Sequence, residues 1–242
     1  MSAGSISPAD LAEALHAGLC DAAQARDQEQ AVIGLDGEDE LALHPLLADA
    51  LHAAEYGAHR EVHYPGVRDR GSARDGERCD LVLTTEGRPL RPRADRATLF
   101  DDPDAVEPEH AFWLEVKVVA QFRASGPNRQ YSSQLLSVVS SDLRKLGSDP
   151  AIRAAALAVI LFTREEAVAI HDLAVWQQRC LEKGHALGVP SVRGFPITDR
   201  IGTGQIATAH HPLPIRSVIG NGWCAASVAT PCGRISGLPH HE

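Results

Sequence analysis

The sequence predicts an α/β fold in which helices flank a mixed central sheet. Two apolar stretches of strand length, residues 111–120 and 154–163, have the composition of strands buried on both faces, as at the centre of a sheet. Around them, helical and strand-like patterns follow in the order helix, strand, strand, strand, helix, strand, helix. The 242 residues suffice for one substantial core, and no apolar run approaches the ~20 residues of a membrane-spanning helix.

Two helices are expected ahead of the first strand. Residues 7–30 carry leucines at a spacing of four behind a proline in the first turn, and residues 39–56 place leucine and alanine on one face. Most of the net charge of −9 lies here, because eleven acidic residues and a single arginine precede Ala58. A protein that coats nucleic acid non-specifically would carry the opposite charge. The N-terminus lacks the basic and apolar regions of a signal peptide, so a cytoplasmic location is expected.

Three strands are predicted next. Residues 59–64 alternate in polarity up to a Pro-Gly turn, and residues 78–84 form a short apolar run that Asp80 opens. An arginine-containing loop separates these two strands. A polar insertion over residues 86–110 then leads to the apolar strand 111–120. A connection of this length is usually functional or mobile, and the alternative is a solvated surface loop.

The predicted core is completed by a helix over residues 129–146, a buried strand over 154–163 and a helix over 164–186. Within the first of these helices, Asp142 and Lys145 are expected to form a surface ion pair. The remaining residues are rich in turn formers with short β-prone pieces. We therefore divide the chain into an N-terminal helical extension, residues 1–38, a core, residues 39–187, and a small β-rich C-terminal extension packed on the core, residues 188–242.

Two charged residues interrupt the most apolar strand. Glu115 and Lys117 lie two apart, so they share a face of the strand. Burying such charges costs several kcal/mol per ion unless each finds a partner. One interpretation is a structural ion pair on a half-exposed strand. The other is a site that needs a metal-binding carboxylate beside a cation.

An aspartate opening one apolar strand, followed by Glu-x-Lys in the next, resembles the PD-(D/E)xK superfamily of restriction-endonuclease-like nucleases. The residues that carry the resemblance are Asp80, Glu115 and Lys117. The resemblance implies an α-β-β-β-α-β core and covers residues 40–163, about half of the chain. Two departures are that Cys79 stands where the motif has proline and that 34 residues separate Asp80 from Glu115.

The resemblance implies a magnesium-dependent phosphodiesterase, with Mn²⁺ able to substitute. Magnesium takes carboxylate and carbonyl oxygens, so Asp80, Glu115 and the backbone carbonyl of Val116 are assigned as metal ligands. Lys117 would orient or deprotonate the attacking water, or offset charge on the phosphate. Glu40, on the helix before the first strand, is assigned as a further ligand. Its alternative role is a helix N-terminal carboxylate favoured by the dipole, and Glu61 is a weaker substitute for it.

DNA is the expected substrate, with RNA as an alternative. From Ala58 to Phe100 the chain carries nine arginines and seven acidic residues, so positive charge gathers near the predicted site. A homodimer is expected by resemblance alone. The alternative function is a non-catalytic module that binds nucleic acid or a protein. The residues assigned to nucleic-acid binding are Arg68, Arg70, Arg74, Arg78, Gln130 and Gln134.

The cysteines and histidines do not predict a structural metal or a disulfide framework. Five cysteines without regular spacing are expected to be free thiols in a reducing compartment. No CxxC or HxxxH pair supports a zinc site among the C-terminal histidines and cysteines. The three tryptophans are expected in the core.

Overall fold

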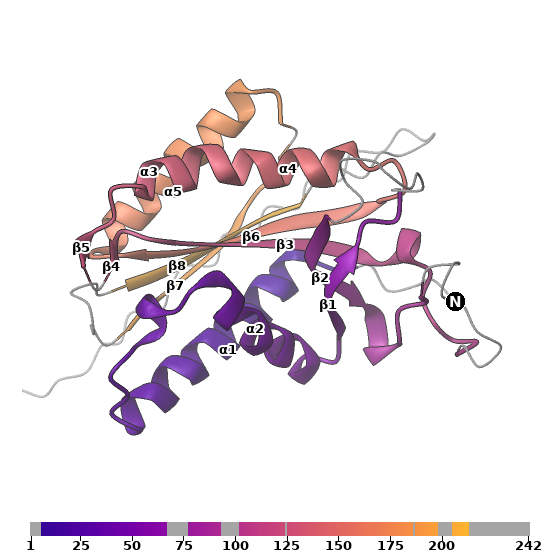
Figure 1. Cartoon of the computed structure of the whole chain (residues 1–242), viewed down its shortest axis with the longest axis horizontal. Coiled ribbons are helices and arrows are strands. Elements are labelled where there is room, and N and C mark those ends of the chain that lie inside the picture. The colour runs from indigo at the N-terminus through magenta and orange to yellow at the C-terminus, as the bar shows by residue number, and fades with distance from the viewer. Residues whose placement is uncertain are drawn as a thin grey trace, which may run out of the picture.

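The computed structural model of the chain describes residues 6–66, 77–92, 102–123, 125–185, 187–197 and 205–212. Within these ranges, six strands form one mixed sheet in the order β1-β2-β3-β6-β8-β7, and two short strands form a separate ribbon (Figure 1). The sheet strands are β1 (Gly57–His63), β2 (Arg78–Thr84), β3 (Phe112–Ala120), β6 (Ala154–Thr163), β7 (Ser191–Pro196) and β8 (Gln205–Pro212), and the ribbon is β4 (Phe122–Arg123) with β5 (Gly126–Pro127).

Strand directions divide the sheet into a meander and a crossover. β1, β2 and β3 are antiparallel neighbours, whereas β3 and β6 run parallel and pair along their whole length, from Phe112 with Ala154 to Ala120 with Phe162. A parallel pair needs a long connection, and here helices supply it. β8 and β7 continue the sheet beyond β6 as antiparallel strands. The predicted α/β fold with a mixed central sheet flanked by helices is confirmed.

Helices α1 (Pro8–Gln28) and α2 (Glu40–Ala53) cover one face of the sheet (Figure 1). Each begins at a side-chain cap: the Ser7 hydroxyl accepts from the amides of residues 9 and 10, and Asp39 accepts from Ala42 N at 2.8 Å. A short 3₁₀ turn, η1 (Leu35–Gly37), lies between them. The core on this side joins both helices to alternate residues of the central strands, including Leu11, Leu15, Leu43, Leu47, Leu114, Val116, Ala158 and Ile160.

Helices α3 (Tyr131–Ser133), α4 (Val139–Ser148) and α5 (Glu166–Glu182) cover the opposite face (Figure 1). A π-helical turn, η4 (Gln134–Val138), joins α3 to α4, so the predicted single helix is interrupted near its start. Trp176 of α5 is completely buried against the other set of alternate residues, which includes Val119, Leu157, Val159 and Leu161. Trp113 is also completely buried, so the core position expected of the tryptophans is confirmed for these two, whereas Trp223 lies outside the described residues.

The insertion between β2 and β3 is described only in part. It starts with a 3₁₀ turn, η2 (Thr85–Gly87), and ends with another, η3 (Pro108–His110). An isolated bridge between Leu90 and Val106 brings its two ends together. Because these ends are tied, the insertion returns the chain to the sheet close to where it left, and β3 can pair with β2.

Close packing of α1 on α2 gives the first testable prediction. A methyl group on Gly18 would overlap the Cβ of Ala50, so the two helix backbones approach as only glycine allows. We expect Gly18→Ala to lower the free energy of unfolding by about 1–3 kcal/mol. The control is Gly147→Ala in α4, where the added methyl meets nothing within 4 Å and should stabilise by up to about 1 kcal/mol. Urea unfolding measures the free energy of unfolding of both variants. Equal changes in the two would contradict the close approach of the helices.

Candidate metal centre

The site lies where β2 parts from β3. The two strands pair only at residues 81–83 and 112–114, so no strand of the described residues lies along that edge of the second half of β3. Carboxylates occupy that edge instead. Val116 N donates to Asp80 Oδ2 at 2.7 Å, and Val118 N donates to Glu40 Oε2 at 3.1 Å. Backbone amides that a strand would otherwise satisfy therefore hold two of the predicted metal ligands in place. The carbonyl of Val116 points to the same edge, because a strand residue directs its N–H and C=O to one side.

Asp80 and Glu115 meet across the gap. The register of β2 and β3, continued by one residue, sets them opposite each other, and their side chains are hydrogen-bonded. Glu115 is only 3% exposed, and Tyr64 donates its hydroxyl to Glu115 Oε1. Burial, and next the charge of Asp80, raise the pKa of Glu115 to about 9, while the Tyr64 hydrogen bond acts in the opposite direction. At neutral pH Glu115 thus keeps its proton in this arrangement, and an added cation would favour its ionised form.

Lys117 lies between two carboxylates from opposite layers of the fold. Its Nζ is 2.9 Å from Glu40 of α2 and 3.5 Å from Asp142 Oδ2 of α4. Burial alone would lower the pKa of Lys117, but the hydrogen bond and charge of Glu40, and the charge of Asp142, outweigh it, so the pKa is raised. The side chain is therefore an ammonium ion whose position is fixed from both sides of the sheet.

The position of Asp142 contradicts the prediction that its ion pair with Lys145 lies on the surface. Its predicted pair with Lys145 is present, with Lys145 Nζ 2.9 Å from Asp142 Oδ1. The pair is not on the surface, because Asp142 is 4% exposed and its other oxygen faces Lys117. Buried Leu143 and Leu146 neighbour it along α4, and Leu146 lies four residues on, on the same helix face. That spacing was the available signal that Asp142 faces inward.

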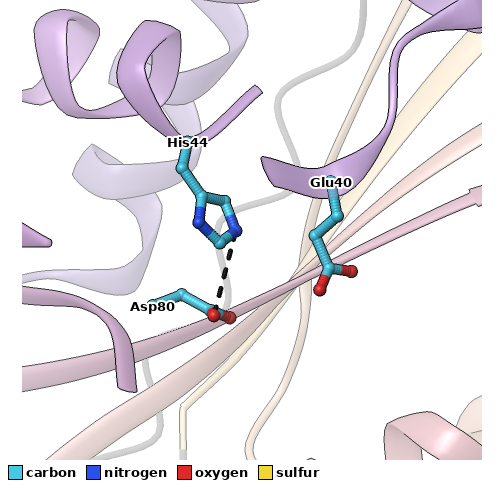
Figure 2. A group of neighbouring side chains, drawn as sticks. All are labelled: Glu40, His44 and Asp80. Atoms are coloured by element: carbon cyan, nitrogen blue, oxygen red, sulfur yellow. Dashed lines mark ion pairs between the residues drawn. The ribbon is translucent and has the colours of Figure 1, made fainter. Parts of the chain in front are cut away.

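His44 is a second site residue that the sequence analysis missed. It lies one turn after Glu40 in α2, and its side chain is 1% exposed. Its Nε2 is 3.8 Å from Asp80 Oδ1, and Figure 2 shows the ring directed at Asp80 with Glu40 alongside. One ligand atom from each of Glu40, His44 and Asp80 lies within 4.8 Å of the others. The spacing of four between Glu40 and His44 was the sequence signal, since such residues share a helix face.

The residues assigned to nucleic-acid binding are placed less fully. Arg68, Arg70 and Arg74 lie outside the described residues. Arg78 is exposed at the start of β2, two residues from Asp80. The glutamines belong to the turn before α4: exposed Gln130 caps α3, and Gln134 accepts from Asn128 Nδ2 at 3.0 Å. The contacts of the described residues do not bring either glutamine to the carboxylates.

Comparison of the chain with family models, curated proteins and solved structures finds no match. In the described part of the chain, no helix is both long and apolar enough to cross a membrane. The three described cysteines, Cys20, Cys79 and Cys180, form no disulfide, and Cys224 and Cys232 lie outside the described residues. Cys79, beside Asp80, is completely buried, and this burial, with the charges of Glu115 and Asp80, raises the pKa of its thiol.

Proposed function

We propose that the protein is a magnesium-dependent phosphodiesterase, an endonuclease that cleaves DNA. The observation that carries the proposal is the convergence of Asp80, Glu115, Glu40 and Lys117 at the open edge of β3. The order of elements from α2 to β6, with its antiparallel meander and helical crossover, supports an α-β-β-β-α-β core like that of the restriction-endonuclease-like nucleases.

The carboxylates suit a hard divalent cation. Asp80, Glu115, Glu40 and the carbonyl of Val116 are the oxygen ligands that Mg²⁺ prefers, and Mn²⁺ accepts the same set. Burial first, and then the charge of Asp80, raise the pKa of Glu115, so a bound cation would have to displace the proton that Glu115 holds. When bound, the cation would polarise a phosphate oxygen and lower the pKa of a water molecule.

The protein's own side chains would then orient the metal ligands and stabilise charge on the phosphate. Lys117 acts as a cation rather than as a base, because its raised pKa keeps the ammonium charged. It would stabilise negative charge that develops on the phosphate. Glu40 and Asp142 hold its Nζ, and the Tyr64 hydroxyl orients the Glu115 carboxyl. The site remains open to a substrate, since the side chains of Lys117 and Glu40 are 16% and 28% exposed.

A nucleic-acid substrate is proposed over small phosphodiesters because arginines precede the motif, and DNA is the expected nucleic acid because of the resemblance to restriction-endonuclease-like nucleases. Arg78, which is exposed two residues before Asp80, would contact phosphate, as would Arg68, Arg70 and Arg74 earlier in the sequence. A homodimer, a cytoplasmic location and the division into segments at residues 38 and 187 remain predictions. The test below distinguishes DNA from RNA and cleavage from binding alone.

The proposal is tested by incubating the protein with plasmid DNA, single-stranded DNA and RNA, with Mg²⁺ or with EDTA. We expect DNA cleavage with Mg²⁺, none with EDTA, and a loss of at least about 100-fold in rate for Asp80→Asn. The matched control is Asp104→Asn, an exposed aspartate of the insertion, which should cleave as the wild type does. Binding without cleavage would favour the non-catalytic module, and equal activity of Asp80→Asn would reject the site.

A further inference from the structure

His44 is buried and has no hydrogen-bond partner among the residues that the structure describes. Its side chain is 1% exposed, and neither Nδ1 nor Nε2 makes a hydrogen bond. Leaving such a polar group unpaired in a protein interior is destabilising, so an unpaired imidazole in a core position is unusual. The ring is directed into the carboxylate cluster rather than into the apolar core (Figure 2). A histidine placed only for packing has no reason to face Asp80.

Glu61 lies on the other side of the ring. It is the residue of β1 between Arg60 and Val62, and the strand register sets it opposite Asp80. Its φ is 55°, in the left-handed region that non-glycine residues rarely adopt because the backbone is strained there. With this backbone, Glu61 Oε1 lies 3.7 Å from His44 Nδ1. Strained backbone of this kind clusters at functional sites.

We propose that His44 Nε2 is a metal ligand and that, together with Asp80 and Glu40, it binds a divalent transition-metal ion. Glu61 would orient the ring from behind, because a metal-binding histidine commonly donates its second N–H to a carboxylate. The two oxygens of Asp80 face different ways: Oδ2 accepts from Val116 N, and Oδ1 is the oxygen nearest His44. Asp80 thus belongs both to the strand edge and to the histidine cluster.

The spacing of the ligand atoms is close to what one ion requires. Ligands about 2.1 Å from an octahedral ion stand roughly 3 Å apart when adjacent and roughly 4.2 Å apart when opposite. Here His44 Nε2 and Asp80 Oδ1 are 3.8 Å apart, and all three ligand atoms lie within 4.8 Å of one another. Small side-chain rotations would bring them to a common ion. Glu40 can contribute one oxygen while the other stays with Lys117 or Val118 N.

The imidazole determines which metals the cluster would bind. Mg²⁺ and Ca²⁺ favour oxygen ligands, whereas a nitrogen ligand favours ions such as Mn²⁺, Co²⁺ and Ni²⁺. The inference deepens the proposed function, because it concerns the ion used at the same site. It makes a claim about binding, however, which is measured without any substrate.

The test is electron spin-echo envelope modulation of Mn²⁺ added to the full chain. We expect ¹⁴N modulation from a coordinated imidazole in the wild type, lost in His44→Gln, with an Mn²⁺ affinity lower by at least about tenfold. Mg²⁺ affinity, from calorimetry, should change less than about threefold. The matched control is His171→Gln, which removes a largely exposed imidazole on α5 and should keep the modulation. Glu61→Gln should keep the modulation and weaken Mn²⁺ binding about tenfold.

Each outcome has a distinct consequence. Bound Mn²⁺ without ¹⁴N modulation in the wild type, or modulation that persists in folded His44→Gln, overturns the inference, and so does an absence of Mn²⁺ binding. Nitrogen coordination without DNA cleavage supports the inference and rejects the proposed nuclease. DNA cleavage with a bound ion that has no nitrogen ligand supports the proposed nuclease and rejects the inference.

Discussion

Replacing Lys117 by methionine is expected to reduce DNA cleavage by roughly 10²–10⁴-fold, the range seen when a group that stabilises developing charge or transfers a proton is removed. Methionine keeps a comparable length and removes only the ammonium. Burial lowers the pKa of Lys117, but Glu40 and Asp142 outweigh it and the pKa is raised, so the wild-type side chain is charged throughout the pH range of the assay. The loss should therefore appear in kcat at all pH values tested, from about pH 6 to about pH 9.

Lys145→Met is the matched control for this prediction. Lys145 contacts the same carboxylate, with its Nζ 2.9 Å from Asp142 Oδ1, but it approaches from the solvent side and is 33% exposed. Its removal takes a positive charge from Asp142 while leaving Lys117 with Glu40. We expect less than about a tenfold loss of rate. If both variants are folded by circular dichroism and lose cleavage rate equally, the loss would reflect the removal of positive charge near Asp142 and not a specific role of Lys117.

The second large effect is expected from Glu115→Gln, measured as stability against pH with EDTA present. The pKa of Glu115 is raised to about 9, chiefly by burial and then by Asp80, so the native chain keeps a proton that the unfolded chain releases above about pH 4.5. Stability from this group is complete below that ordinary value and is lost as the pH rises through about 9. Between about pH 5 and about pH 9 the wild type should lose roughly 2–5 kcal/mol, and Glu115→Gln should not.

Thermal unfolding measures this difference. For a chain of this size the wild type should melt roughly 5–15 °C lower at about pH 9 than at about pH 5, while Glu115→Gln changes much less. Saturating Mg²⁺ should remove most of the loss in the wild type, because a bound cation stabilises the charged carboxylates. Glu29→Gln, an exposed acid at the end of α1, should retain the wild-type profile. Parallel profiles for wild type and Glu115→Gln would contradict the raised pKa.

The order of helices and strands was predictable because each signal is local. The apolar runs of β3 and β6 identify central strands whatever surrounds them, and the observed bounds of both lie within one residue of those expected. Pro8 and the leucine spacing identify α1 in the same way. Glu115 and Lys117 were also recognisable locally, because charged side chains in an apolar strand are costly to bury unless they have partners.

The partners themselves could not be predicted, because they depend on how far β2 pairs with β3 and on which helix face meets the sheet. The short pairing of these strands frees the amides of Val116 and Val118 for Asp80 and Glu40. The packing of α4 and α2 on opposite faces then brings Asp142 to Lys117 and His44 to Asp80. Local sequence patterns were enough to predict the main helices and the central strands that carry the charges. The pairing of those charges depends on the folded arrangement, because side chains far apart in the chain converge where β2 and β3 separate.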